Sequence, residues 1–281
     1  MQENIIKFHS CHISNNEDKS FVPIPVKNYI PKWFREKDKY KKHGDNYELK
    51  FANINGKAVV HRMPTWKSCP ALVDIFTTGY YFLTPCDITF TKAKEKTDHV
   101  HHDSCTHGQI DAPLDLDYDA KWGSVHSETE LGHFRLSQPI CRPRSVEEGF
   151  PTPDGYYDFT YTWFSNYFVQ VPEGYTVLFT HPMNINDLPF RTVSGFNDAS
   201  NFMTGPGNLP FHIKKDWEGT IPAGTPYAQI IPIKNESWTS EIVDYTEEQM
   251  AEYLENKHKE YMLGHGITKY KELDWLKKHY E

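Results

Sequence analysis

Several features are missing from this 281-residue sequence, and each absence excludes a class of protein. No apolar run approaches the roughly 18 residues that a transmembrane helix requires, so we expect no membrane partner. The N-terminus carries no signal peptide. The five cysteines are odd in number and include no Cys-x-x-Cys pair. Together these absences predict a reduced, intracellular chain located in the cytoplasm.

Common catalytic signatures are also missing. The sequence contains neither a Gly-x-Ser-x-Gly elbow nor a His-Glu-x-x-His helix. A glycine- and proline-rich turn at residues 205–208 lacks the lysine and the strand–loop–helix context of a phosphate-binding loop. The net charge of −8 argues against non-specific binding to nucleic acid. One stretch, residues 27–42, is locally basic with interleaved aromatic residues, and we interpret it as a solvated surface with lysine stems.

A short segment occurs twice, with a spacing of 50 residues, at positions 171–182 and 221–232. Both copies begin with a β-branched residue and Pro-x-Gly, which is a turn signal because proline presets φ and glycine accepts a positive φ. A run of β-branched and aromatic residues follows in each copy, and a second proline is expected to end the strand. The two copies predict two equivalent corners of one β-sandwich.

Aromatic residues make up 15% of the chain and apolar residues 38%, which is enough for a packed core. We predict a mainly β fold, a double-stranded β-helix or jelly-roll sandwich, with an irregular N-terminal segment and two C-terminal helices. The expected domains are an N-terminal wrap over residues 1–48, the sandwich over 49–240 and a helical extension over 241–281. The helices are expected to brace the sandwich, with a partner-binding tail as the alternative.

Local signals place the individual elements. A hairpin is predicted over residues 49–60 because Asn55-Gly56 suits a type I′ turn. A short helix should begin at Ser68-Cys69-Pro70 and stop at Gly79, followed by a strand over 80–90 that is interrupted or bent at Pro85. Alternating aromatic residues predict a strand over 156–171. A capping box at 246–249 predicts a helix to about residue 263, and a second helix is expected over 269–280.

The residues best suited to chemistry are histidines. Residues 99–107 contain four of the 15 histidines of the chain, together with Asp103 and Cys105. His-x-His on a strand would direct two imidazoles to one face, and imidazole and carboxylate ligands suit Zn, Fe or Mn. We predict a divalent metal held by His101, His107 and His181, with Asp103 as a further ligand. Two other readings stay open, namely a solvated histidine-rich loop and a Cys105 nucleophile with His107 as base.

Three stretches resemble a known family: Cys69-Pro70-Ala71-Leu72 through Thr78-Gly79-Tyr80, then His181-Pro182, then 224–234. The resemblance is to an uncharacterised family found in marine tailed bacteriophages and some bacteria. It implies an infected host cell, or a virion, as the setting. The order Pro172, Gly174, His181, Asn184 is also similar to the second motif of cupins. Residues 224–231 are similar to a strand of the deoxyuridine triphosphatase fold.

These resemblances lead to three expectations about function. The first is a cupin-like metal-dependent enzyme, of oxygenase or hydrolase type, acting on a small molecule or peptide. In that enzyme Gln109 and Asn184 would help to position the bound group. The second is a non-enzymatic phage module, in the virion or bound to a host protein, whose interface would be formed by aromatic residues and the terminal helices. The third is a nucleotide enzyme of the deoxyuridine triphosphatase type. A homo-oligomer is compatible with all three.

Overall fold

A computed structural model shows how the predicted elements are arranged. It describes residues 5–10, 22–54, 57–93, 112–118, 125–129, 132–136, 141–145, 151–165, 167–200, 209–262 and 275–280. No helix in these ranges has both the length and the apolar character needed to cross a bilayer.

The chain forms two compact units. Unit 1 contains residues 1–24 and 79–235, and unit 2 contains residues 25–78 and 236–281. This division differs from the domain boundaries expected at residues 48 and 240. The hairpin over 49–60 belongs with the C-terminal residues rather than with the sandwich.

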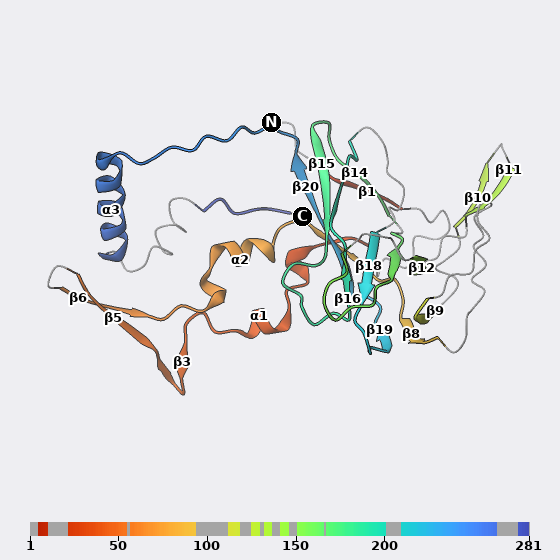
Figure 1. The fold of residues 1–281 in the computed structure, drawn as a ribbon, viewed down its shortest axis with the longest axis horizontal. Coiled ribbons are helices and arrows are strands. Elements are labelled where there is room, and N and C mark those ends of the chain that lie inside the picture. The colour runs from red at the N-terminus through yellow and green to blue at the C-terminus, as the bar shows by residue number, and fades with distance from the viewer. Residues whose placement is uncertain are drawn as a thin grey trace. The chain divides into compact units, whose positions relative to one another are not determined.

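The first sheet of unit 1 is antiparallel at its centre (Figure 1). Its strand order is β17-β15-β20-β7-β2. The strands are β17 (Gly195–Asn197), β15 (Tyr175–Thr180), β20 (Pro226–Lys234), β7 (Tyr80–Leu83) and the short β2 (Ile24–Pro25).

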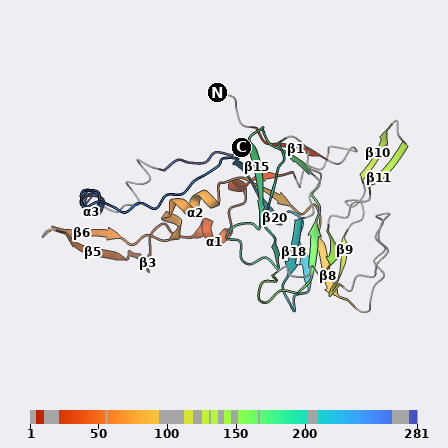
Figure 2. The ribbon, with the colours of Figure 1, turned by 45° about the horizontal axis from the view of Figure 1, so that its top comes forward.

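Two further sheets of unit 1 complete the sandwich (Figure 2). The second sheet has the order β12-β13-β18-β16, with β12 (Cys141–Ser145), β13 (Thr160–Trp163), β18 (Leu209–Ile213) and β16 (Phe190–Thr192). The third has the order β19-β8-β9, with β19 (Gly219–Ile221), β8 (Ile88–Lys92) and β9 (Leu114–Tyr118). Two separate strand pairs are β1 (Lys7–Ser10) with β14 (Tyr167–Gln170) and β10 (Val125–Thr129) with β11 (Gly132–Leu136).

Aromatic side chains from the facing sheets fill the interior of unit 1. Trp163 on β13 stacks on Phe211 of β18 at a centroid distance of 4.0 Å and on Tyr227 of β20 at 5.0 Å. The Tyr161 hydroxyl is bonded to both backbone groups of Leu114, which ties the second sheet to the third. Burial of each such side chain is worth roughly 1.5–3 kcal/mol. The predicted mainly β, jelly-roll-type sandwich is therefore confirmed.

The two copies of the repeated segment become neighbouring strands of the first sheet. In each copy the residue after the glycine donates its N–H to the carbonyl of the first proline, over 3.2 Å, and the glycines have φ of +82° and +78°. The strands then pair antiparallel, from Tyr175 opposite Lys234 to Thr180 opposite Gln229. The equivalent turns were predicted correctly.

One detail of the repeat was predicted wrongly. Pro232 lies inside β20 instead of ending it. The N–H of Asn235 bonds the carbonyl of Gly174, so odd-numbered residues of β20 direct their N–H toward β15. Pro232 therefore faces the other side of the strand, where pairing with β7 has already stopped at Ile230. The N–H that proline lacks is not needed there.

Unit 2 consists of one 16-residue helix and several shorter elements (Figure 2). Its helical elements are η1 (Val26–Asn28), α1 (Lys32–Glu36), η2 (Trp66–Ser68), α2 (Pro70–Ile75) and α3 (Glu247–Met262). Its strands form two hairpins, β3 (Lys42–His43) with β4 (Asn46–Tyr47) and β5 (Leu49–Ile54) with β6 (Lys57–Arg62). The predicted hairpin over 49–60 and the predicted helix after residue 246 are both confirmed.

Other expectations for this part of the chain need correction. Residues 22–48 contain helical turns and short strands, so the N-terminal segment is less irregular than expected. Residues 275–280 of the predicted second C-terminal helix have no helical structure. Cys69, rather than Ser68, is the N-cap of α2.

Candidate functional site

The interior of the sandwich is the first place to look for a site, because the metal prediction places one there. Near Trp163 this interior is occupied by stacked aromatic rings rather than by polar side chains. Among the described residues, no three His, Cys, Asp or Glu side chains come together in a way that could hold a metal ion. The described interior near Trp163 is therefore a packed aromatic core.

His181, the one predicted metal ligand within the described residues, is bound to the backbone through both ring nitrogens. Its Nε2 lies 3.2 Å from the carbonyl oxygen of Ile185, and its Nδ1 accepts the N–H of Thr192 over 3.3 Å. Burial lowers the pKa of His181 to about 4, an effect increased by the positive charges of Arg191 and Lys214. In this geometry the imidazole is neutral and both nitrogens are used in holding the 181–192 connection together.

Of the other predicted site residues, the structure describes Asn184 alone. His101, Asp103, His107 and Gln109 lie outside the described residues. Asn184 occupies the turn after β15 with φ of +61°, a conformation that asparagine tolerates well. The metal site and the roles of Gln109 and Asn184 therefore stay predictions.

Two open cavities on unit 1 are each about 300 Å³ in volume. One is lined by Arg191 and His212, which are directly opposite each other on β16 and β18, and by Thr152 and Ser194. Both hydroxyls already have partners, since Thr152 donates to Asp158 and Ser194 bonds Thr180. The exposed Arg191 is the main charge at this cavity, so any anion held there would be bound weakly. The second cavity lies beside the β1–β14 pair, and its lining includes Lys7, Gln170 and Glu173.

Unit 2 presents a much larger feature, an apolar surface. Seventeen large apolar side chains are exposed in the described residues, and all but Ile5 and Phe196 belong to unit 2. In the described part of unit 2, only Val26, Phe34 and Phe76 are large apolar side chains with full burial. We call the exposed set the apolar surface of unit 2. It consists of Tyr29, Trp33, Tyr47, Leu49, Phe51, Val60, Trp66, Trp238, Ile242, Val243, Tyr245, Met250, Tyr253, Leu254 and Leu276.

The hairpin β5–β6 carries part of this surface. Phe51 lies directly opposite Val60, and these side chains are 71% and 48% exposed. Trp66, at the start of η2, is also 71% exposed. Side chains on a strand alternate between faces, so Leu49 and Phe51 share one side of the ribbon. An apolar face of this kind is typical of a strand pair that a partner covers.

The residues after β20 carry another part of the surface. Residues 235–246 have no strand or helix, yet they include Trp238 and Ile242, which are 84% and 98% exposed. Helix α3 begins at a complete capping box, in which the Gln249 side chain accepts the Thr246 N–H and the Thr246 hydroxyl accepts the Gln249 N–H. Met250, Tyr253 and Leu254 share one face of α3 and are exposed.

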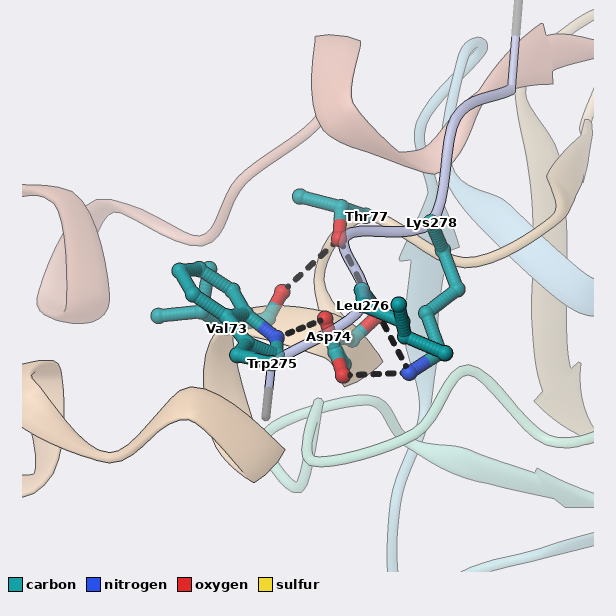
Figure 3. Close-up of polar contacts among 6 residues, drawn as sticks. All are labelled: Val73, Asp74, Thr77, Trp275, Leu276 and Lys278. Carbon is teal, nitrogen blue, oxygen red and sulfur yellow. Dashed lines mark hydrogen bonds and ion pairs between the residues drawn. The ribbon is translucent and has the colours of Figure 1, made fainter. Parts of the chain in front are cut away.

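The C-terminal residues of unit 2 are tied to α2 by one carboxylate (Figure 3). The Trp275 indole N–H donates to Oδ1 of Asp74 over 3.0 Å, and the Lys278 ammonium donates to Oδ2 over 2.9 Å. Lys278 also bonds the carbonyl of Leu276. Asp74 thus fixes residues 275–278 to the helix that follows the hairpin.

The segments that form the apolar surface of unit 2 were covered by the predictions from sequence, but an exposed apolar surface was not predicted there. The basic stretch with interleaved aromatics was interpreted as a solvated surface, and the hairpin was placed in the sandwich. The available signal was an apolar face on the hairpin, formed by Leu49, Phe51 and Val60, the residue opposite Phe51. The sequence pattern is the same for an apolar residue in a core and for one on an exposed face, so the exposure of these side chains is known only from the structure.

Comparison with known proteins adds little. No family model and no curated protein matches the chain. Among solved structures, the dUTPase from phage phi11 of S. aureus is 18% identical, with a TM-score of 0.22, and the match covers 39% of this chain and 97% of the dUTPase. A mutant dUTPase of Staphylococcus bacteriophage 80alpha is also 18% identical, with a TM-score of 0.21, and the match covers 38% of this chain and 97% of that protein. Scores this low do not establish a shared fold.

Proposed function

We propose that this chain is a non-enzymatic assembly module, in which the sandwich of unit 1 is the scaffold and the apolar surface of unit 2 is an interface for copies of the same chain. The observation that carries this proposal is the imbalance in unit 2 between many exposed and few buried apolar side chains. Exposed apolar area costs roughly 25 cal/mol per Å², so a partner that covers this surface would be bound favourably.

The secondary structure of unit 2 supports the same proposal. β5 and β6 pair with each other in a two-stranded sheet, and an isolated two-stranded hairpin is marginal in water. Helix α3 exposes its described side chains, although helices of this length depend mainly on packing for stability. Both elements would gain stability from contact with another chain.

The setting stays a prediction from the resemblance to a phage-associated family, which favours a virion or a contact with a host protein. A cupin-like enzyme stays the alternative. It depends on a histidine cluster that lies outside the described residues.

Measuring the mass of the protein in solution tests the proposal. The wild-type chain should form oligomers in the micromolar range by light scattering. A Phe51→Ser, Trp66→Ser double variant should shift assembly to at least tenfold higher concentration. Phe196→Ser, on unit 1, is the matched control, since Phe196 is 68% exposed but belongs to the scaffold. A wild-type chain that stays monomeric at about 100 µM would overturn the proposal.

Elemental analysis of untagged protein tests the alternative. Stoichiometric Fe, Zn or Mn that is lost in a His107→Ala, His181→Ala variant would favour the metal-dependent enzyme instead. The two experiments use the same preparation, so an enzyme and an assembly module are separated directly.

A further inference from the structure

Unit 2 contains two segments of opposite charge. Residues 236–255, which we call the acidic arm, contain seven acidic residues and no Lys or Arg. Residues 27–42, which we call the basic segment, contain seven Lys or Arg and two acidic residues. One chain therefore carries both halves of a complementary pair.

The charges of the basic segment are not balanced locally. Its two acids, Glu36 and Asp38, form exposed ion pairs with Lys32 and Lys42 at 3.9 and 3.4 Å. Five further positive charges exceed what these acids can neutralise. They are Lys27, Arg35, Lys37, Lys39 and Lys41.

Both segments combine charge with exposed aromatic side chains. The acidic arm exposes Trp238, Tyr245 and Tyr253, and the basic segment exposes Tyr29 and Trp33. Interfaces are enriched in tyrosine, tryptophan and arginine, and opposite charges on the two sides set the partner and the register. The acidic arm and the basic segment could therefore bury apolar area against each other as well as pair opposite charges.

The residues of the arm before α3 are long enough to reach a neighbouring copy. It begins after Asn235, whose N–H is bonded to Gly174 over 2.7 Å, and it continues without regular structure to the start of α3. Eleven extended residues span up to about 36 Å. The apolar side chains of the arm stay exposed within its own chain, with Ile242 at 98%.

We propose that the acidic arm of one copy binds the basic segment of another copy. This inference rests on the proposed assembly function and names the two surfaces that would meet. Because the two surfaces differ, the contact is heterologous. Two copies can exchange arms reciprocally, or successive copies can continue into a ring.

A charge-swap experiment tests the inference. An arm variant and a segment variant are each expected to lose assembly, because like charges then face each other. The arm variant carries Glu236→Lys, Glu241→Lys, Asp244→Lys, Glu252→Lys and Glu255→Lys, which leaves two acids and five lysines in the arm. The segment variant carries Lys32→Glu, Lys37→Glu, Lys39→Glu and Lys41→Glu, which leaves three Lys or Arg and six acids in the segment.

Each variant alone should require at least tenfold higher concentration to assemble than the wild type. An equimolar mixture should recover assembly, because the reversed arm then meets the reversed segment and the wild-type arm meets the wild-type segment. Recovery in the mixture also shows that both variants are folded and that the contact is between chains. Contacts within one chain would give no recovery on mixing.

Matched controls place the same charge changes on exposed residues of unit 1, and these variants should assemble like the wild type. The control for the segment variant is Lys7→Glu, Lys92→Glu, Lys215→Glu and Lys234→Glu. The control for the arm variant is Asp117→Lys, Asp154→Lys, Glu173→Lys, Asp187→Lys and Asp198→Lys.

The outcomes separate this inference from the proposed function. Wild-type protein that assembles, with charge variants that assemble equally well or a mixture that does not recover, overturns the pairing of arm and segment alone. Wild-type protein that stays monomeric overturns both.

Discussion

At the scale of single residues, His181 holds the 181–192 connection together as a neutral imidazole. Its pKa is about 4 in the folded protein, below the ordinary value of 6.5. Between pH 4 and pH 6.5, His181 is therefore mostly protonated in the unfolded chain and mostly neutral in the folded chain. Stability from this residue is fully present above pH 6.5 and is lost as the pH falls toward 4.

The expected result is a fall in the free energy of unfolding by up to about 3 kcal/mol between pH 7 and pH 4 from this residue. His181→Gln should remove that part of the pH dependence, which urea denaturation at the two pH values measures. His9→Gln is the control, because His9 is also a half-buried histidine but bonds the Gln170 side chain instead of backbone groups. An unchanged pH dependence in the His181 variant would contradict this account.

Gly79 illustrates a residue whose backbone geometry permits no side chain. Its φ is +79°, and a Cβ atom there would overlap the backbone carbonyl of Ile230 on the neighbouring strand. Gly79→Ala should lower the free energy of unfolding by roughly 3 kcal/mol or more, because backbone strain and steric overlap add. Gly174→Ala is the matched control, since Gly174 has φ of +82° and open space around it. Chemical denaturation should show about 1 kcal/mol for the control.

Asp74 accepts two charged or polar donors from residues 275–278 and keeps a partly buried side chain. Asp74→Ala should release this C-terminal segment, because the indole and the ammonium both lose their acceptor. Amide hydrogen exchange at residues 275–280 should speed up about fivefold to tenfold, which corresponds to roughly 1–1.4 kcal/mol. Asp87→Ala, which removes a different side-chain acceptor, is the control. Equal exchange in Asp74→Ala and the wild type would show that the carboxylate does not hold the segment.

At the scale of elements, local signals predicted most of the sandwich. The paired Pro-x-Gly turns, the interruption of the strand at Pro85 and the capping box each depend on a few neighbouring residues, and each lies where expected. The failures depend on distant partners. Pro232 is tolerated in β20 because β7 stops short, and the hairpin over 49–62 belongs to unit 2 because of contacts that spacing does not encode.

The candidate site could be predicted less well for the same reason. A histidine-rich stretch indicates metal ligands by composition, but His181 uses both nitrogens on backbone groups that lie four and eleven residues away. In the sequence, the residues of the apolar surface of unit 2 cannot be distinguished from the aromatic and aliphatic residues of a core. Exposure becomes visible only when the elements that could cover them have been placed.

Helix α3 allows a test of whether a capping box can stabilise a helix whose described side chains pack against no core. Its described side chains are exposed, so the capping box should supply a large share of its stability. Thr246→Ala should cost about 1 kcal/mol of helix stability and lower the helical signal of residues 247–262 in the unassembled protein. Thr239→Ala, in the extended part of the arm, should leave that signal unchanged. Backbone chemical shifts measure both, and an unaltered helix in Thr246→Ala would mean that packing rather than capping maintains α3.

At the scale of the whole molecule, the net charge of −8 conceals an uneven distribution. A chain with this net charge repels its own copies at long range, yet the acidic arm and the basic segment attract at contact. Salt screens charges over about 10 Å at 0.1 M and about 3 Å at 1 M. The two effects therefore respond to salt in opposite directions.

If the arm and the segment meet, their attraction should outweigh the repulsion between the net charges of two copies. The opposite charges in the contact lie close together, whereas the net charges act over the larger distance between the two copies. Assembly of the wild-type chain is therefore expected to weaken at least tenfold between 0.05 and 0.5 M NaCl, whereas the free energy of unfolding of unit 1 should change little. Sedimentation at a series of salt concentrations measures the first, and denaturation the second. A purely apolar interface would instead strengthen with salt, because screening would remove the net repulsion between copies. That result would show that charge pairing between the arm and the segment does not drive assembly.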